Sequence, residues 1–294
     1  MKISIIGIGR LGGALAIALS EKGFEVENLV ARNVENAQRI AEYLSQKPRI
    51  LKTDELGEIS SEIIFIATQD SEIENVAESL AQKLKNKPSV FHTSGSLSSD
   101  NLQKLKEIGC SVGSIHPLVS VSDAILGAKH FRDVFFCVEG DDTAVEKAKK
   151  LVEILGGKSF SIETKYKTLY HASAVTASGH LVALLDVALE MLQKCALNEA
   201  HAREILLPLI KSTVENLETQ RAEQALTGTF ARADAQTLQR HIQVLSRTVS
   251  TEALEIFLLL GLRSLRLAEE QGASVEKVSE MRKIISLAKT NFKC

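Results

Sequence analysis

The sequence is poor in aromatic residues, which make up 4% of its 294 residues, and it has no tryptophan. A core must therefore be built from Leu, Ile, Val and Ala, which favours helices and a buried parallel sheet over a β-sandwich. The formal net charge is only −2, and no basic stripe is visible. Nucleic acid is therefore not an expected partner.

Cysteine is also scarce. The four cysteines, Cys110, Cys137, Cys195 and Cys294, include no C-x-x-C pair, so neither a disulfide framework nor a metal site is predicted. Such sparse cysteines are typical of a reducing cytoplasm, and Met1 leads directly into a predicted core strand without room for a signal peptide. We expect a cytoplasmic protein.

Long apolar runs are missing as well. The stretch 181–192 is interrupted by Asp186 and Glu190. No run reaches the roughly 18 uncharged apolar residues that a membrane span requires. We therefore expect no membrane partner.

The most informative stretch is the N-terminus. Residues 2–6 form a short β-rich run, and a G-x-G-x-x-G motif and a helix-forming segment follow, in the order Gly7, Ile8, Gly9, Arg10, Leu11 and Gly12. In such a motif the glycines allow the tight turn, the approach of a diphosphate and close helix packing. The helix N-terminus then faces the phosphates. The motif and its context predict a dinucleotide site, against the alternative of a merely structural turn.

The second predicted strand ends in Arg32 and Asn33 and carries no acidic residue at that point. NAD-selective folds usually place Asp or Glu there to bind the ribose 2′-hydroxyl. A guanidinium suits a 2′-phosphate instead. We therefore expect NADP rather than NAD, with a solvated surface arginine as the alternative.

The N-terminal half alternates between strands and helices up to residue 162, which predicts an α/β Rossmann domain with a doubly wound parallel sheet over residues 1–162. Ligands bind at the carboxyl edge of such a sheet. Polar residues follow several predicted strands there, and they are Thr68 and Asp70, then Ser94 and Gly95, then His116. Thr68 and Asp70 are candidate cofactor contacts, and Ser94 and Gly95 are candidate substrate contacts. Helix capping and a simple turn are the alternatives.

Residues 163–294 show helical periodicity throughout and predict an all-helical domain for substrate binding and dimerisation, with one long helix over residues 167–193. Arg232 and Asp234 lie in a loop and are candidate substrate contacts, although Asp234 could simply cap the next helix. His116, His171 and His241 are candidate acids or bases. The apolar run 256–260 exceeds what one helix face needs, which favours a homodimer.

Several further motifs carry a family resemblance. They are His92-Thr93-Ser94-Gly95-Ser96, Ser114-Ile115-His116-Pro117-Leu118, Val138-Glu139-Gly140-Asp141, Tyr170-His171-Ala172-Ser173-Ala174 and the stretch from Leu226 to His241. With the glycine motif, they resemble Rossmann-like proteins whose C-terminal half is a domain of unknown function. These are relatives of deazaflavin-type NADP oxidoreductases, pyrroline-5-carboxylate reductase and 6-phosphogluconate dehydrogenase. The resemblance covers nearly the whole chain.

The resemblance implies a Rossmann domain, a helical domain like that of 6-phosphogluconate dehydrogenase, and NADP as cofactor. The chain departs from the family pattern at Thr229, where Pro is usual, at Ala233, where Gly is usual, and at Gly179, where Asn is usual. We therefore expect an NADP-dependent oxidoreductase for a small polar substrate. The alternative is a dinucleotide-binding sensor or scaffold without turnover.

Overall fold

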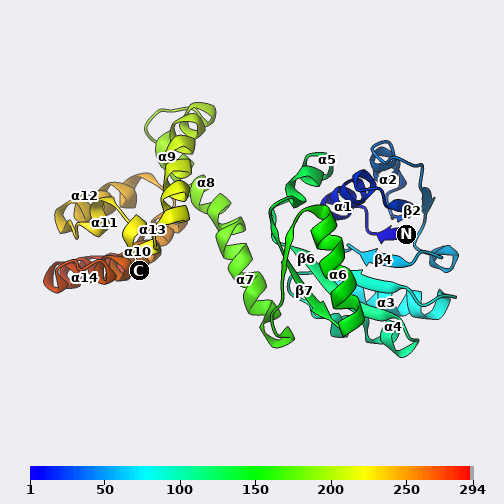
Figure 1. Ribbon diagram of the computed structural model, residues 1–294. Coiled ribbons are helices and arrows are strands. Elements are labelled where there is room, and N and C mark those ends of the chain that lie inside the picture. Colours follow the sequence, from blue (N-terminus) through cyan, green and yellow to red (C-terminus); the bar gives the residue numbers. More distant parts are fainter. Residues whose placement is uncertain (292–294) are drawn as a thin grey trace. The chain divides into compact units, whose positions relative to one another are not determined.

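The computed structural model describes residues 1–291, and it divides the chain into two compact units after Ser178 (Figure 1). The first unit is an α/β fold, and the second is built of helices. This is the predicted fold class. By its contacts, the helix that precedes Ser178 belongs to the first unit.

The first unit contains a sheet whose spatial order is β3-β2-β1-β4-β5-β6-β7-β8. The strands are β1 (Lys2–Ile6), β2 (Glu25–Val30), β3 (Arg49–Leu51), β4 (Ile63–Ile66), β5 (Ser89–His92), β6 (Ser111–Pro117), β7 (Phe135–Gly140) and β8 (Lys158–Phe160). All neighbours pair in parallel except β6 and β7, which pair antiparallel, with Ile115 opposite Val138. The expectation of a purely parallel sheet is therefore corrected at that one pair.

Helices cover both faces of the sheet, as the unbroken apolar strands predict. The helices of this unit are α1 (Arg10–Glu21), α2 (Val34–Ala41), α3 (Asp70–Lys83), α4 (Gln103–Glu107), α5 (Ala124–Gly127), α6 (Asp142–Leu155) and α7 (Lys167–Ala177). The core on one face takes buried residues from α1, α2, α5 and α6, and the core on the other takes them from α3 and α4. This packing leaves the carboxyl ends of the parallel strands to loops.

The second unit has its own apolar core, which includes Leu238, Leu258 and Ile285. Its helices are α8 (Gly179–Gln193), α9 (Glu199–Thr219), α10 (Ala222–Ala225), α11 (Gly228–Ala231), α12 (Ala235–Thr248), α13 (Thr251–Glu270) and α14 (Val275–Asn291).

The single helix predicted over residues 167–193 is interrupted in the structure. Ser178 (φ −114°, ψ −69°) separates α7 from α8, and a Ser-Gly pair is a common place for such a break. Taken across the break, Thr164–Gln193 is long and apolar enough to cross a membrane by length and composition, with a mean hydropathy of 1.5 in its most apolar window. The expectation that no stretch would pass this test is wrong. One such helix is weak evidence for a membrane span.

Three of the four cysteines lie in the part of the chain that the structure describes. Cys110 and Cys137 are buried and free, and Cys195 is exposed and free. Cys294 lies outside the described residues. Within residues 1–291, no group of three or more His, Cys, Asp or Glu side chains could hold a metal ion.

Candidate active site

The glycine motif forms a turn that tolerates no side chain at two of its positions. Gly7 adopts a φ of +96°, and a Cβ there would lie 2.7 Å from the backbone of Ala67. A Cβ at Gly12 would lie 2.0 Å from the carbonyl oxygen of Gly7. These glycines therefore bring β1, α1 and the end of β4 together.

Gly9 differs, because the space around it is open. It is the N-cap of α1, and among the described residues no side chain caps this helix and no heavy atom lies within 4 Å of a Cβ built on Gly9. The first turn carries no acidic residue. The free N–H groups and the positive end of the helix dipole therefore face open space, as an anion site requires. The backbone of Ile8, Arg10 and Leu11 belongs to the same turn.

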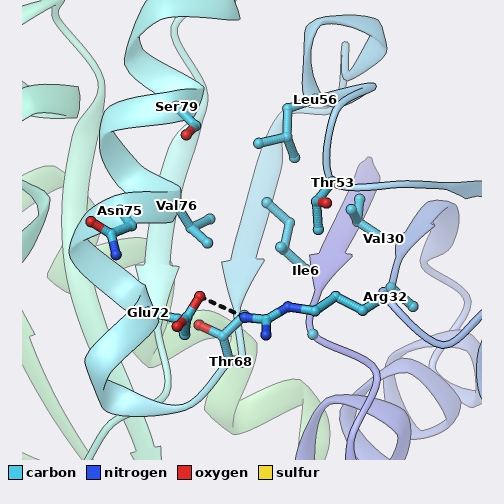
Figure 2. A pocket seen from close by; sticks show the side chains of 12 residues that line it. Ile6, Val30, Arg32, Thr53, Leu56, Thr68, Glu72, Asn75, Val76 and Ser79 are labelled. Atoms are coloured by element: carbon cyan, nitrogen blue, oxygen red, sulfur yellow. Dashed lines mark hydrogen bonds and ion pairs between the residues drawn. The ribbon is translucent and has the colours of Figure 1, made fainter.

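A cavity of about 320 Å³ adjoins this turn, and Gly7, Arg32, Thr68 and Glu72 contribute to its lining (Figure 2). The Arg32 guanidinium, 70% exposed, reaches Glu72 of α3 at 2.5 Å. The hydroxyl oxygen of Thr68 is buried and has no hydrogen-bond partner among the described residues. An open cradle, an unpartnered hydroxyl and an arginine at the end of β2 fit a dinucleotide.

Two other predicted cofactor contacts have local roles. The Asn33 side chain caps α2 by accepting from the N–H of Asn36 at 3.1 Å. Asp70, in the first turn of α3, accepts a hydrogen bond from the Ser96 hydroxyl at 2.7 Å. Asp70 therefore connects the end of β4 to the turn that follows β5.

The turn that follows β5 contains Ser94 and Gly95, and hydrogen bonds among its own residues hold it in place. The Ser94 Oγ accepts from the N–H groups of Ser96 (3.1 Å) and Leu97 (3.0 Å). His92 accepts from the Ser94 N–H at Nδ1 (3.2 Å), so its Nε2–H donates to the Ser98 carbonyl (3.0 Å). Burial, with a smaller effect of nearby Lys167, lowers the pKa of His92 to about 4. His92 is therefore a neutral structural group.

Two histidines stand over Gly95. A Cβ on Gly95 would lie 2.6 Å from His171 Cδ2 and 2.7 Å from His116 Nε2. The two imidazole rings meet edge to face at 5.8 Å between centroids. The structure thus brings together Ser94, Gly95, His116 and His171, all in the first unit.

His116 has a fixed partner, because its Nδ1 lies 2.7 Å from the hydroxyl of Tyr170. Burial, the Lys167 charge and His171 lower the pKa of His116 to about 4, against an opposing effect of Asp70. Burial raises the pKa of Tyr170. At neutral pH both groups are therefore uncharged, and a single hydrogen bond joins them.

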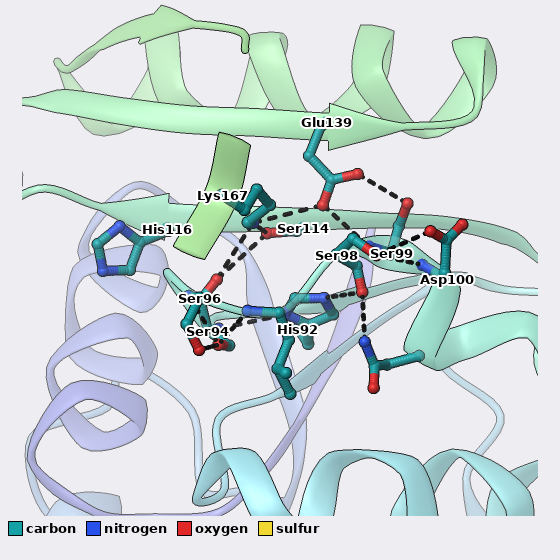
Figure 3. A network of polar contacts seen from close by, with 12 residues as sticks. His92, Ser94, Ser96, Ser98, Ser99, Asp100, Ser114, His116, Glu139 and Lys167 are labelled. Atoms are coloured by element: carbon teal, nitrogen blue, oxygen red, sulfur yellow. Dashed lines mark hydrogen bonds and ion pairs between the residues drawn. The ribbon is translucent and has the colours of Figure 1, made fainter. Parts of the chain in front are cut away.

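The sequence reading missed Glu139 and Lys167 as parts of this site. They form an ion pair at 3.4 Å next to the Ser94 turn (Figure 3), and their side chains are 6% and 1% exposed. Glu139 follows the apolar run of β7, and Lys167 lies one helical turn before Tyr170. The signal available in the sequence was Glu139, a single acidic residue at the end of a buried strand.

The remaining predicted residues belong to the second unit. Asp234 caps α12 by accepting from the Thr237 N–H (3.0 Å) and hydroxyl (2.7 Å), as its capping alternative predicted. Arg232 is exposed at the end of α11 and makes no ion pair within residues 1–291. His241 packs edge-on against Phe257 at 6.0 Å between centroids. Their convergence with the first unit stays a prediction.

Residues 1–117 match the family model of a Rossmann-like domain, and residues 134–264 match that of a domain of unknown function, DUF2520. No curated protein matches the chain. A protein of Thermotoga maritima, TM1727, has a similar structure (TM-score 0.68, 27% identity, 92% of this chain and 99% of that chain covered).

Two further solved structures share the fold. One is a proposed NADP oxidoreductase of Bacteroides fragilis (TM-score 0.74, 21% identity, covering 90% and 97% of the two chains). The other is the pyrroline carboxylate reductase of Plasmodium falciparum with NADP bound (TM-score 0.58, 13% identity, covering 96% and 98%).

Fold and matches define the class: a Rossmann-like protein with a mainly parallel sheet and a helical C-terminal region. More particularly, this chain joins a Rossmann-like domain to a C-terminal DUF2520 domain, as the sequence motifs predicted.

Proposed function

We propose that this protein is an NADP-dependent oxidoreductase that transfers a hydride between the nicotinamide and a small polar substrate. The observation that carries the proposal is the pairing of two features on one sheet edge. An open glycine turn follows β1, and His116 of β6 and His171 of α7 both lie against Gly95, in the turn that follows β5. Ligands of such sheets bind outside the carboxyl ends of the strands.

The residues present fit the cofactor. The α1 N-terminus at Gly9 would hold the diphosphate, the cavity beside Thr68 would hold the adenosine, and Arg32 would bind the 2′-phosphate. The same-fold reductase of Plasmodium falciparum binds NADP. When bound, the nicotinamide supplies or accepts the hydride.

The protein itself would contribute a hydrogen-bond donor and the Ser94–Gly95 turn, which borders the space that the donor faces. If the Tyr170 hydroxyl donates to Nδ1 of His116, the proton of the neutral imidazole resides on Nε2, which faces the space over Gly95. A neutral imidazole N–H can polarise a carbonyl or imine group. His116 is therefore our first candidate, while His171 shares its site and His241 remains a candidate from the second unit.

A turnover screen tests this function. The intact protein would be mixed with NADPH and keto acids, imines, and flavin or deazaflavin acceptors, and the loss of NADPH absorbance followed. We expect turnover with at least one class, and His116→Gln should reduce it while sparing NADPH binding. Tight NADPH binding with no turnover across all classes would contradict the oxidoreductase and support the sensor or scaffold, which the departure at Gly179 also favours.

We further propose that the protein forms a homodimer through its helical half. In the apolar run 256–260, Leu258 is buried in the core, but Leu259 and Leu260 are 54% and 43% exposed, and Val182 of α8 is 69% exposed. Such apolar side chains at a surface are typical of an interface. Light scattering at micromolar concentration should give twice the chain mass, and Val182→Glu with Leu259→Glu should halve it. A monomeric unmodified protein would contradict the dimer.

A further inference from the structure

Charged side chains are rarely buried, but a lysine lies buried next to the Ser94 turn. Lys167 is the first residue of α7 and is 1% exposed. Burying an ammonium is costly unless it is paired and hydrogen-bonded. Its neighbour Lys165 is 61% exposed and pairs with Glu163 at the surface, as lysines usually do. The burial of Lys167 therefore needs a specific explanation.

The contacts of Lys167 join several elements. Its Nζ donates to the Ser94 carbonyl (3.3 Å) and the Ser114 hydroxyl and pairs with Glu139 (3.4 Å) (Figure 3). Glu139 is held in turn by the Ser99 N–H (2.9 Å) and hydroxyl (2.8 Å). The ammonium thus ties the turn after β5 to β6, β7 and the start of α7.

The same ammonium lies close to His116. Ser114 and His116 are two residues apart on β6, so their side chains lie on one face of the strand. Lys167 and Tyr170 are three residues apart on α7 and therefore lie on one face of the helix. Other titratable groups around His116 are His92 on β5, Cys137 and Glu139 on β7, His171 on α7 and Asp70 on α3.

We propose that Lys167, held by Glu139, is a positioning residue that anchors the Ser94–Gly95 turn and places a positive charge near His116. Burial and this charge together keep the imidazole unprotonated, so that Tyr170 and His116 present one hydrogen-bonding pattern to the space over Gly95. Any effect of Lys167 on catalysis rests on the proposed function, but its positioning of the turn and of His116 does not.

The test is an NMR titration of the His116 imidazole in the intact protein without added ligands, assigned with His116→Gln. In the unmodified protein the ring should stay neutral down to about pH 4. Lys167→Met should raise the midpoint by about one pH unit or more, because a nearby like charge is lost. Lys167→Arg keeps the charge and should keep the low midpoint. Lys165→Met, the matched surface control, should change nothing.

Lys167→Met leaves Glu139 buried without its partner and can fail to fold. The double variant Lys167→Met/Glu139→Gln removes both charges and should also raise the midpoint. In both variants the amides of Ser96 and Leu97, which donate to Ser94, should exchange faster with solvent. An unchanged midpoint in a folded Lys167→Met or double variant would overturn the proposal. A raised midpoint in a protein that does not oxidise NADPH would refute the oxidoreductase and leave the positioning role intact.

Discussion

Two regions of one sheet edge differ in whether their polar groups are hydrogen-bonded within the protein. In the open region, which comprises the Gly7–Gly12 turn and Thr68, the first turn of α1 has no side-chain cap and the Thr68 hydroxyl has no partner among the described residues. In the closed region, at the ends of β5 and β6, His92, Ser94 and Lys167 are all hydrogen-bonded within the protein. Groups left open are available to a ligand, whereas groups satisfied internally hold their geometry before a ligand arrives.

Adding a methyl group at either of two glycines of the open region should give the largest effect. Gly9→Ala meets no described neighbour within 4 Å and has an allowed φ of −87°, so the melting temperature should hold while NADPH affinity falls about 10- to 100-fold. Gly12→Ala meets the Gly7 carbonyl at 2.0 Å and should lower the melting temperature as well. Calorimetric titration and thermal melts on both variants measure this. An unchanged NADPH affinity in Gly9→Ala would show that the diphosphate does not bind at this turn.

The matching change in the closed region is Gly95→Ala. Its methyl group would displace His116 and His171, so kcat/KM on a substrate found by the screen should fall about 100-fold. Affinity for the nicotinamide-free fragment 2′-phospho-ADP-ribose should be retained. Gly57→Ala, whose methyl meets only an ordinary contact at 3.6 Å, is the control. Unchanged turnover in Gly95→Ala would show that the reaction occurs elsewhere.

The closed region should also make folding sensitive to acid. The folded pKa values of His92 and His116, about 4, lie below the unfolded value of 6.5. The unfolded chain therefore binds more protons between these values, and the free energy of unfolding should fall as pH drops from 6.5 to 4, by about 2 kcal/mol for each histidine. Urea unfolding at several pH values measures the slope. A flat profile over this window would mean that these histidines are not held neutral.

The preference for NADPH over NADH is the smallest expected effect, and it concerns the open region. The unmodified protein should bind NADPH about tenfold more tightly than NADH, because Arg32 can pair with a 2′-phosphate. Arg32→Asp should reverse the preference. Glu72→Gln, which frees Arg32 from its present partner, should strengthen NADPH binding and leave NADH unchanged. Equal affinities for both cofactors in the unmodified protein would refute the assignment of NADP from Arg32.

The two regions also differ in how well the sequence predicted them. The glycine turn was predictable because a local motif between a strand and a helix dictates it. The polar residues at the strand ends followed from the sheet topology. The Lys167–Glu139 pair was not predictable, because it joins residues 28 apart through burial that no local pattern encodes. The break at Ser178 was missed because helical periodicity continues across it.

One dinucleotide should span both regions of the edge, and backbone amide NMR tests this most directly. On adding NADPH, the amide signals of Gly9, Thr68 and Gly95 should all shift, whereas 2′-phospho-ADP-ribose should shift only those of Gly9 and Thr68. NADPH shifts that spare Gly95 would contradict the shared site, and NADPH that shifts none of the three would contradict the whole account.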